Sequence, residues 1–80
     1  MKQKLFDAID LANKGDWDKA HKTVQDIEHE YAYWIHANLH RDEGDISNSK
    51  YWYARAKKDY SEMDLKGERE LIKKEIEENL

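Results

Sequence analysis

Two Gly-Asp pairs, at residues 15–16 and 44–45, constrain the fold of this chain more than any other feature. Each glycine can take the left-handed backbone conformation that ends a helix. The aspartate that follows can cap the next helix by accepting a hydrogen bond from a free backbone N–H group. The pairs lie 44 − 15 = 29 residues apart. They therefore predict two helix-turn-helix hairpins in tandem.

Other helix breakers are scarce, because the 80 residues include no proline and three glycines. The scarcity of breakers predicts long helices. We expect a single all-α domain of four to five helices: two antiparallel hairpins over residues 2–29 and 30–58, and a C-terminal capping helix over residues 61–79. No glycine separates the helices on either side of residues 28–30, so one bent helix is an alternative there. Ser61 and Asp64 match the capping-box pattern, and Ser61 is expected to start the last helix.

Apolar spacing assigns an inward face to each helix. The final helix is expected to cover the second hairpin with its apolar stripe and to turn a glutamate–lysine mixture to solvent. His21 and His29 lie among charged residues and are expected at the surface. The expected inward residues are Leu5, Phe6, Ile9, Ala12, Trp17, Ala20, Val24, Ile27, Ile46, Ser49, Tyr53, Ala56, Leu65, Arg69, Ile72, Ile76 and Leu80.

Composition limits the classes of function. Charged residues make up 40% of the chain, but three tryptophans, five tyrosines and one phenylalanine favour a folded core over disorder. Cysteine is absent, which predicts a reducing, cytoplasmic setting. No signal-peptide core or membrane-spanning run is present, so we expect no membrane partner. The net charge of −4 gives no general attraction to nucleic acid.

The hairpin around Gly44 resembles a tetratricopeptide repeat. Tyr33-x-x-His36-Ala37-x-x-His40 precedes the glycine, and Ser49-x-x-x-Tyr53 with Ala56 follows it, in the order of the family signature. The period of 29 residues is shorter than the family's, and the closing proline is missing. The string over residues 36–56 also resembles the core of a group of small bacterial proteins with no assigned activity. The tetratricopeptide likeness implies a helical scaffold that binds a protein or peptide, or a second copy of the chain.

The helix expected over residues 30–43 carries polar chemistry on one side. His36, His40 and Glu43 follow one another at spacings of four and three, so they share a face. Three interpretations stay open: packing with satisfied hydrogen bonds, a metal or small-ligand site formed by these three residues, and a pocket or interface for an organic or peptide partner. The candidate binding residues are His36, His40, Arg41, Glu43, Tyr51 and Trp52.

Three consecutive aromatic residues, Tyr51, Trp52 and Tyr53, cannot all face inward on a helix, because successive side chains diverge by about 100°. Tyr53 fits the core stripe. Tyr51 or Trp52 is therefore expected at an edge or on the surface, where a large aromatic side chain is informative.

Protein or peptide binding is the function that we expect, with no cofactor. A metal or small-ligand site at His36, His40 and Glu43 is the alternative. A basic patch for nucleic acid is a third hypothesis, and it would use Lys50, Arg55, Lys57 and Lys58. Enzymatic activity is not expected, since no nucleophile has a local activating base and no glycine-rich phosphate loop occurs.

Overall fold

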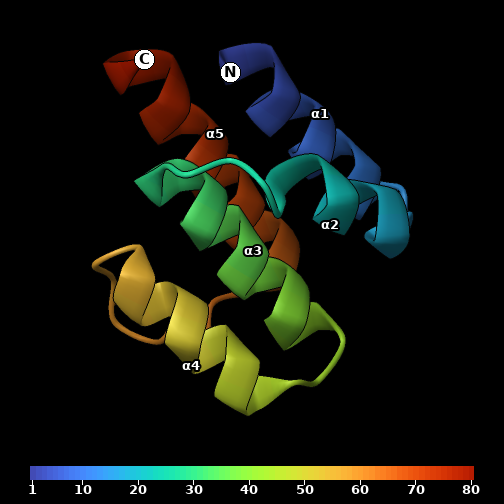
Figure 1. Cartoon of the computed structure of the whole chain (residues 1–80), viewed down its shortest axis with the longest axis vertical. Helices are drawn as coiled ribbons and strands as arrows, with labels where there is room; N and C mark the ends of the chain where they lie inside the picture. Colours follow the sequence, from blue (N-terminus) through green and yellow to red (C-terminus); the bar gives the residue numbers. More distant parts are fainter.

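The computed structural model describes all 80 residues and contains five helices and no strand. The helices are α1 (Lys2–Asn13), α2 (Trp17–Val24), α3 (Glu30–Asp42), α4 (Ile46–Arg55) and α5 (Leu65–Asn79). The all-α prediction is confirmed. In Figure 1, α3 crosses the middle of the molecule, with α1 and α2 on one side and α4 on the other.

The two glycine turns have the predicted conformation. Gly15 and Gly44 both have a φ of 84°, in the left-handed region. At the first turn, the N–H of Asp16 donates to the carbonyl of Leu11 at 2.9 Å. This bond spans five residues and satisfies a carbonyl that the end of the helix leaves free. A side chain at either glycine would strain the backbone.

Both aspartates cap the helices that follow them. The Asp16 carboxylate accepts a hydrogen bond from the N–H of Lys19, and the Asp45 carboxylate accepts one from the N–H of Asn48, each at 3.3 Å. Each caps a free donor in the first turn of its helix. Both Gly-Asp pairs therefore end one helix and cap the next, as predicted.

The boundary between α2 and α3 is a true break. The second helix ends at Val24, and His29 caps the third by accepting a hydrogen bond from the N–H of Tyr31 at 3.1 Å through its Nδ1. The alternative of one bent helix is wrong. His29 thus has a local structural role at the start of α3.

The expected start of the last helix is wrong. Ser61 accepts a hydrogen bond from the N–H of Met63, two residues on, and does not cap a helix. Asp64 is the cap, since its carboxylate accepts from the N–H of Gly67 at 3.0 Å. Its negative charge also suits the positive end of the helix dipole better than a hydroxyl does. The helix therefore begins at Leu65.

Most of the expected inward residues form one core, together with Ala8, Ala32, Trp34, Ile35, Ala37 and Leu39. Two expectations are wrong. Ile46 and Leu80 are 39% and 44% exposed, because they lie at the ends of their helices, beyond the packed turns. Phe6, Trp17 and Ile27 are half-buried and pack against the core.

The last helix covers the second hairpin on α3, and it also packs on the first hairpin. It packs closely against α3 and α1, and it meets α4 only through side chains, since the hydroxyl of Tyr53 on α4 donates to Glu68 on α5. Figure 1 shows α5 behind α3, with the end of α5 beside the start of α1. The face shared by the first helices of the two hairpins is therefore covered, and the outer face of α4 is left open.

None of the five helices combines the length and apolar character needed to span a bilayer.

Candidate functional site

A buried polar network joins α3, α4 and α5 and includes Arg41, one of the candidate binding residues. Glu68 is 1% exposed, and its carboxylate accepts hydrogen bonds from the indole of Trp34, the amide of Asn38, the guanidinium of Arg41 and the hydroxyl of Tyr53, at 2.7–3.1 Å. Arg41 is thus held in a structural ion pair, at 3.1 Å. The network stabilises the fold and engages two nitrogens of Arg41, Nε with Tyr53 and Nη2 with Glu68.

Hydrogen bonding also sets the charge of Glu68. Burial alone raises the pKa of a carboxyl group. Here the donors from Asn38, Tyr53, Trp34 and Arg41 outweigh burial, so the pKa of Glu68 is lowered and the group stays ionised. Burial, and then Glu68 itself, raise the pKa of Tyr53.

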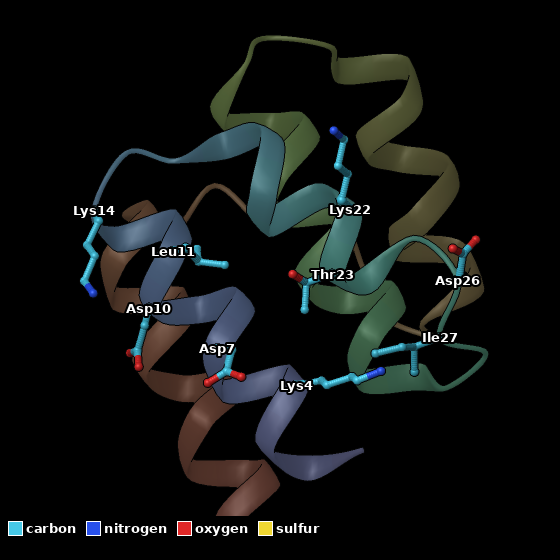
Figure 2. Close-up of a pocket in the computed structure, with 9 residues that line it drawn as sticks. All are labelled: Lys4, Asp7, Asp10, Leu11, Lys14, Lys22, Thr23, Asp26 and Ile27. Carbon is cyan, nitrogen blue, oxygen red and sulfur yellow. The ribbon is translucent and has the colours of Figure 1, made fainter.

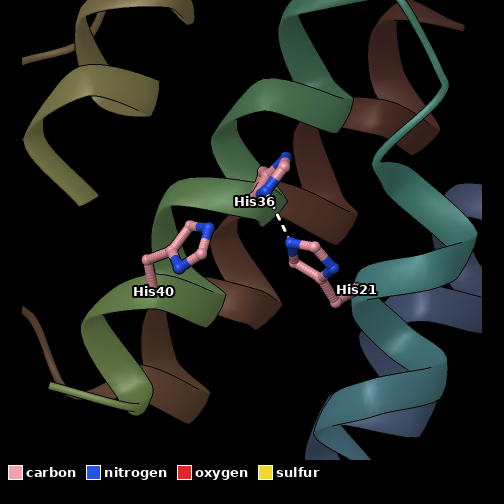
Figure 3. A group of neighbouring side chains, drawn as sticks. All are labelled: His21, His36 and His40. Carbon is pink, nitrogen blue, oxygen red and sulfur yellow. Dashed lines mark hydrogen bonds between the residues drawn. The ribbon is translucent and has the colours of Figure 1, made fainter. Parts of the chain in front are cut away.

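A second polar cluster lies between α2 and α3. His36 and His40 come from successive turns of α3, and His21 reaches across from α2 (Figure 3). The Nε2 atoms of His21 and His36 lie 2.9 Å apart in a hydrogen bond. One ring nitrogen from each of the three residues lies within 4.8 Å of the other two. We call these three residues the histidine cluster.

Two tryptophans hold the cluster's rings in place. Trp17 stacks on His21 with ring centroids 4.8 Å apart, and Trp52 stacks on His36 at 3.9 Å. Trp17 is itself anchored, because its indole N–H donates to the carbonyl of Leu39 at 2.6 Å. Aromatic stacking of this kind restricts ring rotation. The stacking therefore holds the imidazoles of His21 and His36 near their observed positions without a ligand.

Two of the three imidazoles, His36 and His21, favour the neutral form. Burial, followed by the neighbouring His21 and His40, lowers the pKa of His36 to about 3. Burial and then His40 also lower the pKa of His21, against weaker opposing effects from Glu43 and Asp18. A neutral imidazole has a free lone pair, which is the form that coordinates a metal ion.

Glu43 acts on the cluster through His40. The Nδ1 atom of His40 lies 2.7 Å from a carboxylate oxygen of Glu43. When Nδ1 donates its proton to the carboxylate, the lone pair of the ring is on Nε2. A carboxylate behind a histidine fixes the tautomer and the orientation of metal-ligating histidines in the same way.

Two further features of the surface do not form a comparable site. His40, Glu43 and Asp45 also bring one ligand atom each within 4.8 Å of the others, but Asp45 already caps α4. A groove of about 690 Å³ lies between α1 and the end of α2, and Figure 2 draws its lining residues. Its three lysines and three aspartates balance in charge, and none of its residues belongs to the histidine cluster. The groove is lined by Lys4, Asp7, Asp10, Leu11, Lys14, Lys22, Thr23, Asp26 and Ile27.

The remaining candidate residues lie near the cluster or on the surface. His36 and His40 are buried, at 4% and 7% exposure, and Trp52 is half-buried against His36. Tyr51 is 54% exposed, while Tyr53 is buried, as the helical geometry requires. The structure thus brings His36 and His40 together and leaves Tyr51 outside.

His21 was missed from the sequence, and its expected surface position is wrong. It is half-buried, and its ring faces His36. A signal was present, because Trp17, Ala20, His21 and Val24 follow the spacing of a broad inward stripe. The charged neighbours of His21 masked that spacing. Glu68 was missed for the same reason, since it lies in a run of charged residues.

Comparison with known proteins gives no match: no protein-family model, curated protein or solved structure is similar to this chain.

Proposed function

We propose that this protein binds a divalent transition-metal ion through His21, His36 and His40. The observation that carries the proposal is the convergence of three imidazoles from two helices on one point, with ring nitrogens within 4.8 Å of one another. Structural and catalytic zinc sites use imidazole nitrogen as a ligand, and three protein ligands leave one position for water or another ligand. The ligand set thus differs from the one expected from the sequence, since His21 takes the place of Glu43.

The rearrangement that an ion requires is small. Metal–nitrogen bonds of about 2.0–2.1 Å in a tetrahedron place the nitrogens about 3.3 Å apart. The His21–His36 pair at 2.9 Å would open slightly, and the other separations, all within 4.8 Å, would close by at most about 1.5 Å. His21 is half-buried on a helix of eight residues, so α2 supplies the ligand that is freest to move.

The chemistry of the donors favours late transition metals. Imidazole suits zinc, copper and nickel, whereas calcium and magnesium prefer oxygen ligands. Glu43 supports the site from behind His40 rather than filling a coordination position. The two stacked tryptophans provide an optical report of binding, because Trp17 and Trp52 contact ligand rings.

Titration of the metal-free protein with Zn²⁺ by calorimetry tests the proposal, with Co²⁺ absorption as a report of tetrahedral coordination and Cu²⁺ quenching of tryptophan fluorescence as a second signal. We expect one ion per chain. Excess Zn²⁺ at about 100 times the dissociation constant should stabilise the fold by about 2.7 kcal/mol. His36→Phe keeps an aromatic ring against Trp52 and should weaken binding by about 100-fold or more, and Glu43→Gln by about 10-fold.

His29→Asn is the matched control, because it removes a histidine outside the cluster and replaces it with a good helix cap. Its affinity for Zn²⁺ should equal that of the unchanged protein. The proposal is wrong if the unchanged protein shows neither heat nor a shift in melting temperature with Zn²⁺, Ni²⁺ or Cu²⁺. It is also wrong if His36→Phe, folded by circular dichroism, binds Zn²⁺ as tightly as the unchanged protein.

A further inference from the structure

The exposed edge of α4 beside α3 carries an arginine that has no acidic partner. The chain has three arginines. Arg41 pairs with Glu68 at 3.1 Å and Arg69 pairs with Asp42 at 2.9 Å. Arg55 is exposed and forms no ion pair, and its hydrogen bond runs to the hydroxyl of Tyr33 at 3.3 Å. Its guanidinium therefore keeps donors free for a ligand.

Aromatic rings surround this guanidinium. The carbon at its centre lies 4.5 Å from the ring centroid of Tyr33, 5.0 Å from Trp52 and 5.9 Å from Tyr51. We call these four residues, Tyr33, Tyr51, Trp52 and Arg55, the α4 patch. Cation–π contacts hold the planar fork in place without neutralising its charge. Tyrosine, tryptophan and arginine are also the residues that most often dominate binding energy at interfaces.

The charge around the patch is positive although the chain as a whole carries −4. No aspartate or glutamate occurs from Ile46 to Lys58, and Lys50 of α4 is exposed, with its ammonium 5.5 Å from the ring centroid of Tyr60 and in no ion pair. An acidic ligand would therefore be attracted to this face and repelled by much of the remaining surface. Among the helices, α4 packs closely only on α3 and meets α5 only through the buried Tyr53, so no other helix covers the side that carries Tyr51 and Arg55.

We propose that the α4 patch is a docking surface for an acidic peptide segment of a partner protein, in which a carboxylate pairs with Arg55 and a neighbouring apolar side chain packs on Tyr51 and Trp52. Two parallel hydrogen bonds between the carboxylate and a guanidinium would fix the orientation of the bound segment. This proposal goes beyond metal binding and gives a location to the protein- or peptide-binding role predicted from the sequence.

A peptide fits the patch better than a nucleic acid does. Two of the four basic residues that suggested a nucleic-acid site are already paired, Lys57 with Glu30 at 3.3 Å and Lys58 with Glu75 at 3.9 Å. Binding to nucleic acid depends on many phosphate contacts, and two free cations supply few. A peptide with one carboxylate and a neighbouring apolar side chain needs only one free cation beside exposed aromatic rings, and the α4 patch provides both.

Fluorescence polarisation with a labelled peptide of sequence Glu-Glu-Leu-Phe-Glu-Glu, in the presence of EDTA, tests the proposal. We expect saturable, weak binding, on the order of 100 μM, in keeping with a small contact. Arg55→Gln should weaken it by about 10-fold, and Tyr51→Ala should weaken it severalfold. The peptide Gln-Gln-Leu-Phe-Gln-Gln should bind at least about 10-fold less tightly, because it has lost the carboxylates.

Lys66→Gln is the control variant, since it removes one exposed cation from α5, away from the patch, and should leave affinity unchanged. Equal binding by the Arg55→Gln variant, equal binding by the glutamine peptide, or no binding at all would overturn the proposal. Tighter, Arg55-dependent binding of an oligothymidylate would assign the patch to nucleic acid instead. Concentration-dependent self-association that Arg55→Gln abolishes would assign it to a second copy of the chain. Because EDTA removes any metal and neither variant changes a histidine, failure here is separate from failure of the metal proposal.

Discussion

The two buried polar clusters of this protein lie on opposite sides of α3 and differ in the groups that they bring together. Trp34, Asn38 and Arg41 point towards Glu68, whereas His36 and His40 point towards His21. The Glu68 network pairs a charge with an opposite charge and several donors. The histidine cluster contains three imidazoles. A hydrogen bond joins His21 to His36, and the carboxylate of Glu43 lies against His40.

The difference teaches how to separate a structural polar cluster from a candidate site. A buried ion that is fully paired resists change, because loss of either partner leaves an uncompensated charge. Like groups that face one another gain little from their arrangement and remain able to accept a cation. Four predictions test this contrast, from the largest expected effect to the smallest.

Replacement of the central carboxylate should have the greatest effect. Glu68→Leu removes the acceptor of every donor in the network and leaves Arg41 without its partner, so we expect a loss of about 3–5 kcal/mol in the free energy of unfolding. Urea denaturation followed by circular dichroism measures this. Glu70→Gln, an exposed change two residues along the same helix, should change the free energy by less than about 0.5 kcal/mol. A similar small loss for Glu68→Leu would mean that the network contributes no more than surface charge does.

Acid should destabilise the protein through the histidine cluster before it affects Glu68. Burial, with the neighbouring histidines, lowers the pKa of His36 to about 3, while in the unfolded chain it is 6.5. The unfolded state therefore binds a proton below about pH 6.5 that the folded state refuses, so stability is present above that pH and is lost as pH falls towards 3. From pH 7 to pH 5 the metal-free protein should lose about 2 kcal/mol.

The lowered pKa of Glu68 acts in the same direction but at lower pH, because its unfolded value is 4.5. His36→Phe should therefore abolish much of the loss between pH 7 and pH 5 and keep the loss below pH 4.5. Urea denaturation in EDTA across this range measures both. An unchanged pH profile in His36→Phe would show that the imidazole is not desolvated in the folded state.

Removal of one donor should have an intermediate effect. Tyr53→Phe deletes the hydroxyl that donates to Glu68 at 2.7–2.8 Å and keeps the buried ring, so we expect a loss of about 1.5 kcal/mol. Alkaline titration by absorbance gives an independent check. Because burial and Glu68 raise the pKa of Tyr53, one tyrosine should resist ionisation in the folded protein, and that resistant tyrosine should be absent from Tyr53→Phe.

The smallest change is expected in the histidine cluster itself at neutral pH. His36→Phe exchanges a buried neutral ring for an apolar ring of similar size against Trp52, so the metal-free free energy of unfolding should change by less than about 1 kcal/mol at pH 7. Thermal denaturation at pH 7 in EDTA measures it. A loss as large as that of Glu68→Leu would make the cluster a structural element like the network.

Local rules account for most of the helices. The two Gly-Asp pairs end and restart helices through backbone preferences that depend on one or two residues, so both turns could be predicted. A third turn could not. Lys57 has a φ of 60° and ends α4 with a hydrogen bond from the N–H of Lys58 to the carbonyl of Tyr53, in the same pattern as the glycine turns. A lysine gives no sequence signal for a conformation that it adopts at a cost of about 1 kcal/mol or more.

The candidate site could be predicted only in part. His36 and His40 share a face because helical spacing alone brings them together, and Tyr51 diverges from Tyr53 for the same reason. The contribution of His21 depends on how α2 lies against α3, and the burial of Glu68 depends on how α5 packs on α3 with Tyr53 of α4 reaching it. Charged neighbours give such positions the appearance of surface residues.

The sequence by itself therefore determined the helical class, the two early turns and the histidine face of α3, because these depend on neighbours within a few residues. Only the tertiary structure decided the third histidine, the buried carboxylate and the uncovered side of α4. Those features depend on which faces of distant helices meet, and that is a matter of packing across the whole chain rather than of local spacing.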